Sequence, residues 1–261
     1  GGRDHIPIAV EQQVVRWMAE LFDFPSDASG LFVTGSSLAN FIAILVARMA
    51  ALGPSVRSDG LQAQPQTLVA YASAGTHACV AKALDMSGLG SSNLHSISVD
   101  ENLRIDVAAL ERAIVADRTA GKQPFCVIGN AGTVDTGAID DLNALADICQ
   151  RENLWFHVDG ACGALGMMSA RLKPRYAGIQ RADSLALDFH KWAQVPYDAG
   201  FVLVRDRRLH QATFASPAAY LGRAERGMSA GSPWPCDYGP DLSRNFKALK
   251  VWFTLQVYGA D

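Results

Sequence analysis

The chain has 261 residues, enough for one large or two small domains, and 49% of them are hydrophobic, which allows a sizeable core. A net charge of −3 argues against a nucleic-acid surface or a polybasic membrane anchor. The longest apolar run, residues 41–47, is far too short to span a membrane, and no secretory signal opens the sequence. Five cysteines without a Cys-x-x-Cys pair argue against a disulfide framework or a zinc site and favour a reducing, cytoplasmic compartment.

Hydrophobic periodicity predicts the regular elements in chain order. An amphipathic helix over 9–22 and a turn over 25–30 come first, then a strand over 31–34, a helix over 38–52 and a surface loop over 53–66. Beyond this loop, strands are expected over 68–71, 94–99, 125–129, 154–158, 184–189 and 201–204, and helices over 76–86, 106–119 and 141–152, with Asp106 as an N-cap. This alternation predicts an α/β fold with a mostly parallel sheet and helices on both faces.

The pattern lapses over residues 217–241, where four prolines and four glycines argue against a regular helix or strand. We interpret this stretch as a mobile loop, because long loops in compact domains are usually functional or disordered. A last helix is expected from about residue 243. Residues 1–30 are interpreted as an N-terminal helix and its connection, and residues 31–261 as one large domain that ends without a closing element.

The first candidate for chemistry is Lys191, which lies between His190 and Trp192 at the end of an apolar run. Burial at a strand end disfavours the ammonium form and would lower the lysine pKa. A neutral lysine is a nucleophile that can form a Schiff base with an aldehyde. The alternative is that Lys191 only caps the strand and points into solvent.

The second candidate is Asp159, which ends the apolar run over residues 155–158. An unpaired buried carboxylate is costly, so this position needs a cation, and a protonated pyridine nitrogen would serve. The alternative is an aspartate that begins a turn, since Gly160 follows. Lys191 comes about one strand–helix–strand excursion later, so two adjacent strand ends could present both side chains to one small molecule.

Weaker candidates lie at other junctions between strands and helices. Ser36 and Ser37 follow Gly35 at a helix start, where free N–H groups attract phosphate, although an ordinary serine N-cap is the alternative. His77 could stack on a planar ring or face solvent. Thr133 could hydrogen-bond a cofactor or position a nearby acidic residue, but the stretch also suits a plain turn.

Six segments carry the candidate residues and motifs in order along the chain: residues 30–40, 73–77, 132–133 with Asp140, 157–161, 183–184 and 190–192. In this order they resemble motifs of the group II pyridoxal-phosphate-dependent amino acid decarboxylases, and residues 243–252 are similar to a further segment of that family. The resemblance covers nearly the whole chain. Trp192 after the lysine favours this family over the related phospho-base lyases.

The resemblance implies the large domain of a fold type I enzyme that binds pyridoxal 5′-phosphate, with Lys191 as the Schiff-base lysine and the small C-terminal domain missing. Asp159 would pair with the pyridine nitrogen, while His77 and Ala161 would lie against opposite faces of the ring. The phosphate end would be surrounded by Ser36, Ser37, Asp188 and His190. The chain departs from the family pattern at Leu38, Val134 and Asn245.

The resemblance also implies decarboxylation of an L-amino acid to the amine and CO2, in a homodimer with the active site at the subunit interface. An aromatic substrate is slightly favoured because residues 196–200 look like that branch. The acid that protonates the product carbon is expected on the 217–241 loop, with Tyr220 and Tyr238 as candidates. If neither serves, an aldehyde synthase or another carbon–carbon lyase is the alternative, and a non-catalytic homologue is the third hypothesis.

Overall fold

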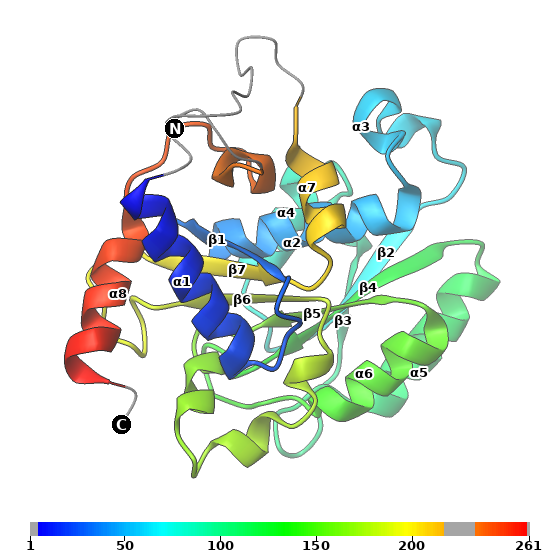
Figure 1. Ribbon diagram of the computed structural model, residues 1–261. Coiled ribbons are helices and arrows are strands. Elements are labelled where there is room, and N and C mark those ends of the chain that lie inside the picture. Colours follow the sequence, from blue (N-terminus) through cyan, green and yellow to red (C-terminus); the bar gives the residue numbers. More distant parts are fainter. Residues whose placement is uncertain (1–4, 217–232, 260–261) are drawn as a thin grey trace.

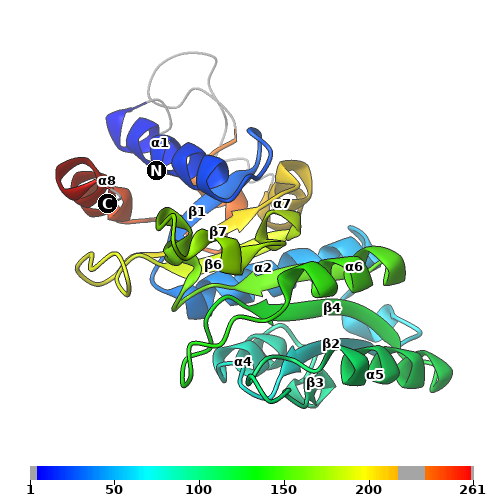
Figure 2. The same cartoon turned by 90° about the horizontal axis from the view of Figure 1, so that it is seen from below.

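A seven-stranded sheet forms the middle layer of the fold, and helices pack on both of its faces (Figures 1 and 2). The computed structural model describes residues 5–216 and 233–259. The strands are β1 (Ser29–Val33), β2 (Leu68–Ser73), β3 (Leu94–Ile97), β4 (Gln123–Asn130), β5 (Trp155–Asp159), β6 (Ser184–Asp188) and β7 (Gly200–Val204). They lie in the order β1-β7-β6-β5-β4-β2-β3, and only β7 runs antiparallel to its neighbours. The prediction of a mostly parallel α/β sheet is therefore confirmed.

The helices divide between the two faces of the sheet. They are α1 (Ile6–Leu21), α2 (Ser36–Leu52), α3 (Val56–Asp59), α4 (Cys79–Met86), α5 (Val107–Thr119), α6 (Leu142–Glu152), α7 (Arg207–Phe214) and α8 (Lys247–Tyr258). Helices α2 and α4 cover one face, while α1, α5 and α6 cover the other and α8 lies beside α1 (Figure 2). Because strand side chains alternate, Ala70 and Ala72 join the core under α4, whereas Val69 and Tyr71 join the core under α5 and α6.

Local capping follows the sequence closely. Asp106 accepts a hydrogen bond from Ala109 N, which confirms the predicted N-cap of α5. Asp141 caps α6 in the same way through Ala144 N. No helix in the described part of the chain combines the length and apolar content that a membrane crossing requires.

Several elements differ from the prediction. Helix α4 begins at Cys79 rather than at 76, because the chain first turns, with Thr76 N donating to Ser73 O. The segment expected to be a loop over 53–66 contains α3, which the buried Val56 anchors. Helix α7 was not predicted, and α8 begins only at Lys247.

The segment expected to be a mobile loop is regular in its last part. Residues Pro235–Tyr238 form the 3-10 helix η7, and the carboxylate of Asp237 accepts a hydrogen bond from Trp234 N at 2.7 Å. Proline at the start of this turn is compatible with helical geometry, because its missing N–H is not needed there. Residues 217–232 of the expected loop, including Tyr220, lie outside the described residues.

The candidate residues lie at the carboxyl ends of three neighbouring parallel strands. The carboxyl ends of β4, β5 and β6 meet there, at Asn130, Asp159 and Asp188. Strand β1 ends at the same place, since its last residue, Val33, and Asp188 both pair with Gly200 of β7. Helix α2 follows β1 directly and therefore also begins there. In open α/β sheets, ligands bind at these strand ends.

Candidate active site

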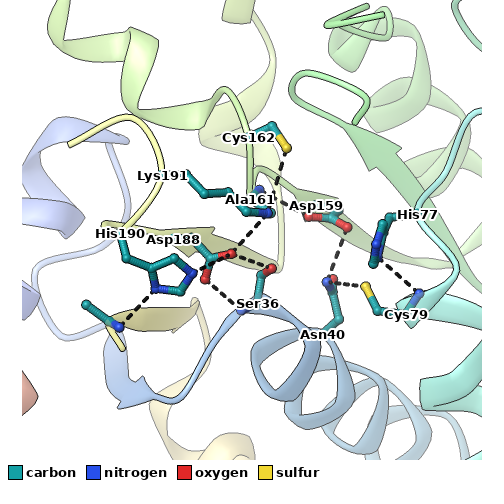
Figure 3. Close-up of polar contacts among 11 residues, drawn as sticks. Ser36, Asn40, His77, Cys79, Asp159, Ala161, Cys162, Asp188, His190 and Lys191 are labelled. Atoms are coloured by element: carbon teal, nitrogen blue, oxygen red, sulfur yellow. Dashed lines mark hydrogen bonds and ion pairs between the residues drawn. The ribbon is translucent and has the colours of Figure 1, made fainter. Parts of the chain in front are cut away.

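Asp188, the last residue of β6, is the centre of one polar cluster. Its Oδ1 accepts from Ser36 N at 2.7 Å and its Oδ2 accepts from Ser36 Oγ at 2.8 Å. The same Oδ2 lies 3.1 Å from Lys191 Nζ and 3.6 Å from His190 Nε2 (Figure 3). One buried carboxylate therefore joins the start of α2 to the lysine. Of the four residues expected around a phosphate, three lie together here.

The ion pair with Asp188 reverses the pKa shift that we expected for Lys191. Burial alone would lower the pKa of the lysine, as the sequence suggested. The charge and hydrogen bond of Asp188, with smaller contributions from Cys162 and Asp159, together outweigh burial, so the pKa is raised above its usual range and the side chain is an ammonium ion. The expectation of a neutral lysine was wrong, because the sequence did not show that the carboxylate three residues upstream turns toward it.

Asp159, the last residue of β5, is buried with 5% exposure and holds two neutral hydrogen bonds. Ala161 N donates to its Oδ1 at 3.1 Å, and Asn40 Nδ2 donates to its Oδ2 at 3.2 Å. Burial raises the pKa of this carboxyl, while the two donors and the more distant Lys191 act in the opposite direction. Among the described residues, no lysine, arginine or histidine nitrogen lies within ion-pair distance of Asp159. The site thus has a buried acid without a protein cation.

The other predicted residues on the protein side are His77, Ser37 and Thr133. Figure 3 shows His77 on the side of Asp159 away from Lys191; His77 is exposed, and its Nδ1 accepts from Cys79 N at 3.2 Å. Ser37 is exposed at the first turn of α2. Thr133 is buried, and its hydroxyl is engaged within its own loop, with Thr136 Oγ1 at 2.8 Å and Ala138 N at 3.1 Å.

Tyr238, one of the two candidate proton donors, lies at the opposite end of the strands from the candidate site. Its hydroxyl accepts from Arg207 Nε at 2.8 Å, and its carbonyl accepts from His210 Nε2 at 2.8 Å. His210 is held in turn by Ser29, the residue at the far end of β1 from the site. This placement contradicts the expectation that Tyr238 delivers a proton at the site, because its hydroxyl is buried and engaged at the other end of the strands.

Three further residues belong to the site but were not singled out from the sequence. Asn40 is fully buried in α2 and joins Asp159 to His157, whose Nε2 lies 2.7 Å from Asn40 Oδ1. Cys162 Sγ lies 3.7 Å from Lys191 Nζ. Two features of the sequence could have indicated them: the polar Asn40 in the apolar stretch of α2, and His157 in the apolar run of β5.

The arrangement combines two chemical capacities at one edge of the sheet. Lys191 offers an amine whose protonation a neighbouring carboxylate controls, and Asp159 offers a buried negative charge for a cationic ligand atom. An amine that binds a carbonyl and an acid that binds a pyridinium are complementary to a pyridoxal ring.

Comparison with known proteins gives consistent matches along the chain. Residues 5–261 match the family model described as the pyridoxal-dependent decarboxylase conserved domain. An aromatic-L-amino-acid decarboxylase of Bacillus atrophaeus is 42% identical over 250 residues, which cover 96% of this chain and 50% of that protein. The chain spans about half the length of the curated relatives it matches.

Solved structures show the same fold. Mouse CSAD in its apo form has a TM-score of 0.90 at 29% identity, covering 98% of this chain and 52% of that one. Rhodiola rosea 4-hydroxyphenylacetaldehyde synthase has a TM-score of 0.82 at 27% identity, covering 97% of this chain and 52% of that one.

Proposed function

Because the chain belongs to the pyridoxal-dependent decarboxylase family, we propose that it supplies the cofactor site of an enzyme that decarboxylates an L-amino acid to the amine and CO2. The observation that carries the proposal is that Lys191, three residues beyond the end of β6, and Asp159, at the end of the adjacent parallel strand β5, lie at the same end of the sheet (Figure 3). The fold is the large domain of fold type I enzymes, and the cofactor of the family is pyridoxal 5′-phosphate.

The residues present fit this cofactor. Asp159 is a buried carboxylate without a cation among the described residues, which is the partner that a protonated pyridine nitrogen requires. Lys191 would be the amine for the cofactor aldehyde, and His77 and Ala161, which lie on either side of Asp159 in Figure 3, would contact the ring. Ser36, Ser37 and His190, near the start of α2, would hold the phosphate.

When bound, pyridoxal phosphate supplies the electron sink for cleavage of a bond at the substrate α-carbon. Asp159 would hold the positive charge at the ring nitrogen and thereby strengthen this electron withdrawal. Asp188 would hold a proton on the Lys191 amine whenever the amine is free, since the two groups lie 3.1 Å apart. The chain would thus fix the ring at two points, its nitrogen and its aldehyde.

An aromatic L-amino acid is the favoured substrate. The Bacillus atrophaeus relative with that name shares 42% of its aligned residues with this chain. Other relatives carry names for different substrates, including L-2,4-diaminobutyrate at 33% identity, so the preference rests on the higher identity.

Aldehyde synthesis is the second candidate activity, and one structural observation favours it. Tyr238 lies away from the site, which removes one of the two tyrosines considered as proton donors for the amine product. The similarity to 4-hydroxyphenylacetaldehyde synthase makes this chemistry compatible with the fold. The amine-to-aldehyde ratio distinguishes the two activities.

We further propose a homodimer with the active site at the subunit interface, working in the cytoplasm. Two exposed aromatic side chains near Lys191 in the chain support the interface: Trp192, which follows Lys191, is 56% exposed, and Tyr197, which stacks on His190, is 78% exposed. Large exposed aromatic groups next to a site are typical of surfaces that a partner covers. Free thiols at Cys79, Cys126, Cys149 and Cys162 support a reducing compartment.

The experiment that tests the function uses the protein at its natural full length, loaded with pyridoxal phosphate. A panel of aromatic, acidic and diamino L-amino acids is assayed for CO2, amine, aldehyde and peroxide separately. We expect CO2 and amine in equal amounts, fastest with an aromatic substrate. Aldehyde and peroxide in place of amine would establish the second activity, and no CO2 from any substrate would indicate a non-catalytic homologue.

A further inference from the structure

A chain of hydrogen bonds runs along strand β5, from Trp155 at its start to Asp159 at its end. Trp155, His157 and Asp159 lie on one face of the strand, because alternate residues of a strand point the same way. Ser184 pairs with His157 on the neighbouring strand β6, and Asn40 reaches down from α2. Every link of this chain is buried or half-buried.

The chemistry of the end groups fixes the direction of the chain. An indole nitrogen can only donate, so Trp155 Nε1 donates to Ser184 Oγ at 2.8 Å. A carboxylate only accepts, so the Asn40 amide nitrogen must face Asp159, at 3.2 Å. The Asn40 carbonyl oxygen then accepts from His157 Nε2, at 2.7 Å, and His157 must carry a hydrogen on Nε2.

The other nitrogen of His157 completes the chain. Ser184 Oγ lies 2.8 Å from His157 Nδ1, and the Ser184 carbonyl oxygen lies 3.2 Å from the same nitrogen. The hydroxyl contact is the shorter one, and its hydrogen is available because the serine oxygen accepts the indole N–H. Burial lowers the pKa of His157 to about 4, so the ring is neutral near pH 7 and Nδ1 accepts. Every donor therefore points toward Asp159, and bonds aligned in this way polarise one another.

We propose that Asn40, His157, Ser184 and Trp155 are positioning residues that orient Asp159 and keep it ionised for the ring nitrogen of the cofactor. The inference deepens the proposed function and rests on it. Burial opposes ionisation of Asp159, and a donor on each carboxylate oxygen counteracts that effect. Because these donors are neutral, they leave the negative charge available to the ligand, whereas an adjacent lysine or arginine would compensate it.

The first test needs no cofactor. In full-length protein labelled with 15N-histidine, the His157 signal, assigned by its loss in His157→Gln, should show a protonated Nε2 and a bare Nδ1 at pH 7. Ser184→Ala should shift the Nδ1 resonance. Ser87→Ala is the matched control, because Ser87 is also buried but donates to Leu84 O outside the chain of bonds. A protonated Nδ1, or a doubly protonated ring, would overturn the proposal.

The second test measures the effect on the cofactor. Asn40→Leu removes the hydrogen bonds of the amide to Asp159 and His157, and its weaker one to Cys79 Sγ. We therefore expect the dissociation constant of pyridoxal phosphate to rise about tenfold or more, with a shifted visible band. Ser184→Ala and Trp155→Phe should weaken binding progressively less, because they act from further along the chain. Thermal unfolding identifies variants that fail to fold, and Ser184→Ala is the milder variant for that case.

The outcomes separate this inference from the function on which it rests. If Asn40→Leu and Ser184→Ala bind the cofactor as tightly as the unaltered protein and with the same spectrum, the positioning role is refuted. If the unaltered protein binds no pyridoxal phosphate, the proposed function fails, and the role toward the ring nitrogen fails with it. The His157 tautomer would then still decide whether the chain of bonds exists.

Discussion

Lys191 Nζ lies 3.1 Å from Asp188 Oδ2, so the lysine at this site is paired with an acid from its own strand end. The same carboxylate accepts two hydrogen bonds from Ser36. The protonation of the lysine is therefore linked to the start of α2, and the neutral amine needed for attack on an aldehyde is the minor form.

The first prediction concerns this ion pair. In Asp188→Asn, burial acts on Lys191 without the compensating charge, so the lysine pKa should fall and the neutral fraction should rise. Each pKa unit lost raises that fraction about tenfold, so Lys191 in cofactor-free protein should react at least severalfold faster with trinitrobenzenesulfonate at pH 8. Peptide mass spectrometry measures the rate. Asp198→Asn is the control, because Asp198 pairs with Lys247 and not with Lys191. If Lys191 reacted equally faster in Asp198→Asn, the role of Asp188 would be contradicted.

Cofactor attachment gives the second prediction. Borohydride reduction of the loaded protein should remove its visible band and leave the mass of the cofactor on the peptide that contains Lys191. Lys191→Ala should lose both signals, because no other described lysine lies beside Asp159 and Asp188. A reducible band that persists in Lys191→Ala would show that another amine carries the cofactor.

The third prediction concerns the charge of Asp159. Asp159→Asn keeps the size of the side chain but removes the buried charge, so turnover should fall by on the order of 100-fold or more while the fold is retained. Steady-state kinetics and circular dichroism test the two parts. Asp147→Asn is the control, since Asp147 is a surface acid paired with Arg181 and should leave turnover unchanged. Full activity in the Asp159→Asn enzyme would rule out the role.

Much of the fold could be read from the sequence because its signals are local. The apolar run of β5 stops at Asp159, and Asp106 marks the start of α5. The direction of β7 could not be read, because an apolar run has the same pattern whichever way the strand points. Parallel and antiparallel neighbours differ only in their connections and pairing.

The candidate site was predictable as a set of strand ends but not as a set of contacts. Asn40 and His157 are far apart in the sequence, and only the packing of α2 on the sheet brings them together. The pKa of Lys191 had the wrong predicted direction because burial was visible in the sequence and the orientation of Asp188 was not. Proline and glycine content predicted a loop around Tyr238 but could not predict its hydrogen bond to Arg207.

The fourth prediction concerns the dependence of stability on pH. Burial would raise the pKa of Asp117, but hydrogen bonds from Lys122 and Tyr71 and the nearby His95 lower it overall. A lowered pKa stabilises the fold above the ordinary aspartate value of about 3.9, and this contribution is lost as the pH falls through the lower native pKa. Asp117→Asn should therefore reduce the free energy of unfolding by about 1 kcal/mol at pH 7.

Urea unfolding at several pH values checks this expectation. The difference between Asp117→Asn and the unaltered protein should shrink as the pH falls below about 4, because the carboxyl then takes up a proton more readily in the unfolded chain than in the native protein. Asp85→Asn on the exposed side of α4 serves as the control and should show no such trend. A difference for Asp117→Asn that stays constant from pH 7 to pH 3 would show that the charge is not the stabilising feature.

The fifth prediction follows from the position of Tyr238. Its hydroxyl accepts from Arg207 at the end of the strands opposite Lys191, and burial raises its pKa, so it remains protonated and engaged. Tyr238→Phe in the full-length protein should leave the ratio of amine to aldehyde unchanged and lower the free energy of unfolding by about 1 kcal/mol. Because Arg207→Gln removes the other partner of the same hydrogen bond, the double variant should cost less than the sum of the single variants. Additive stability effects would show that this hydrogen bond does not stabilise the fold, and a shift from amine to aldehyde in Tyr238→Phe would assign the tyrosine to the chemistry.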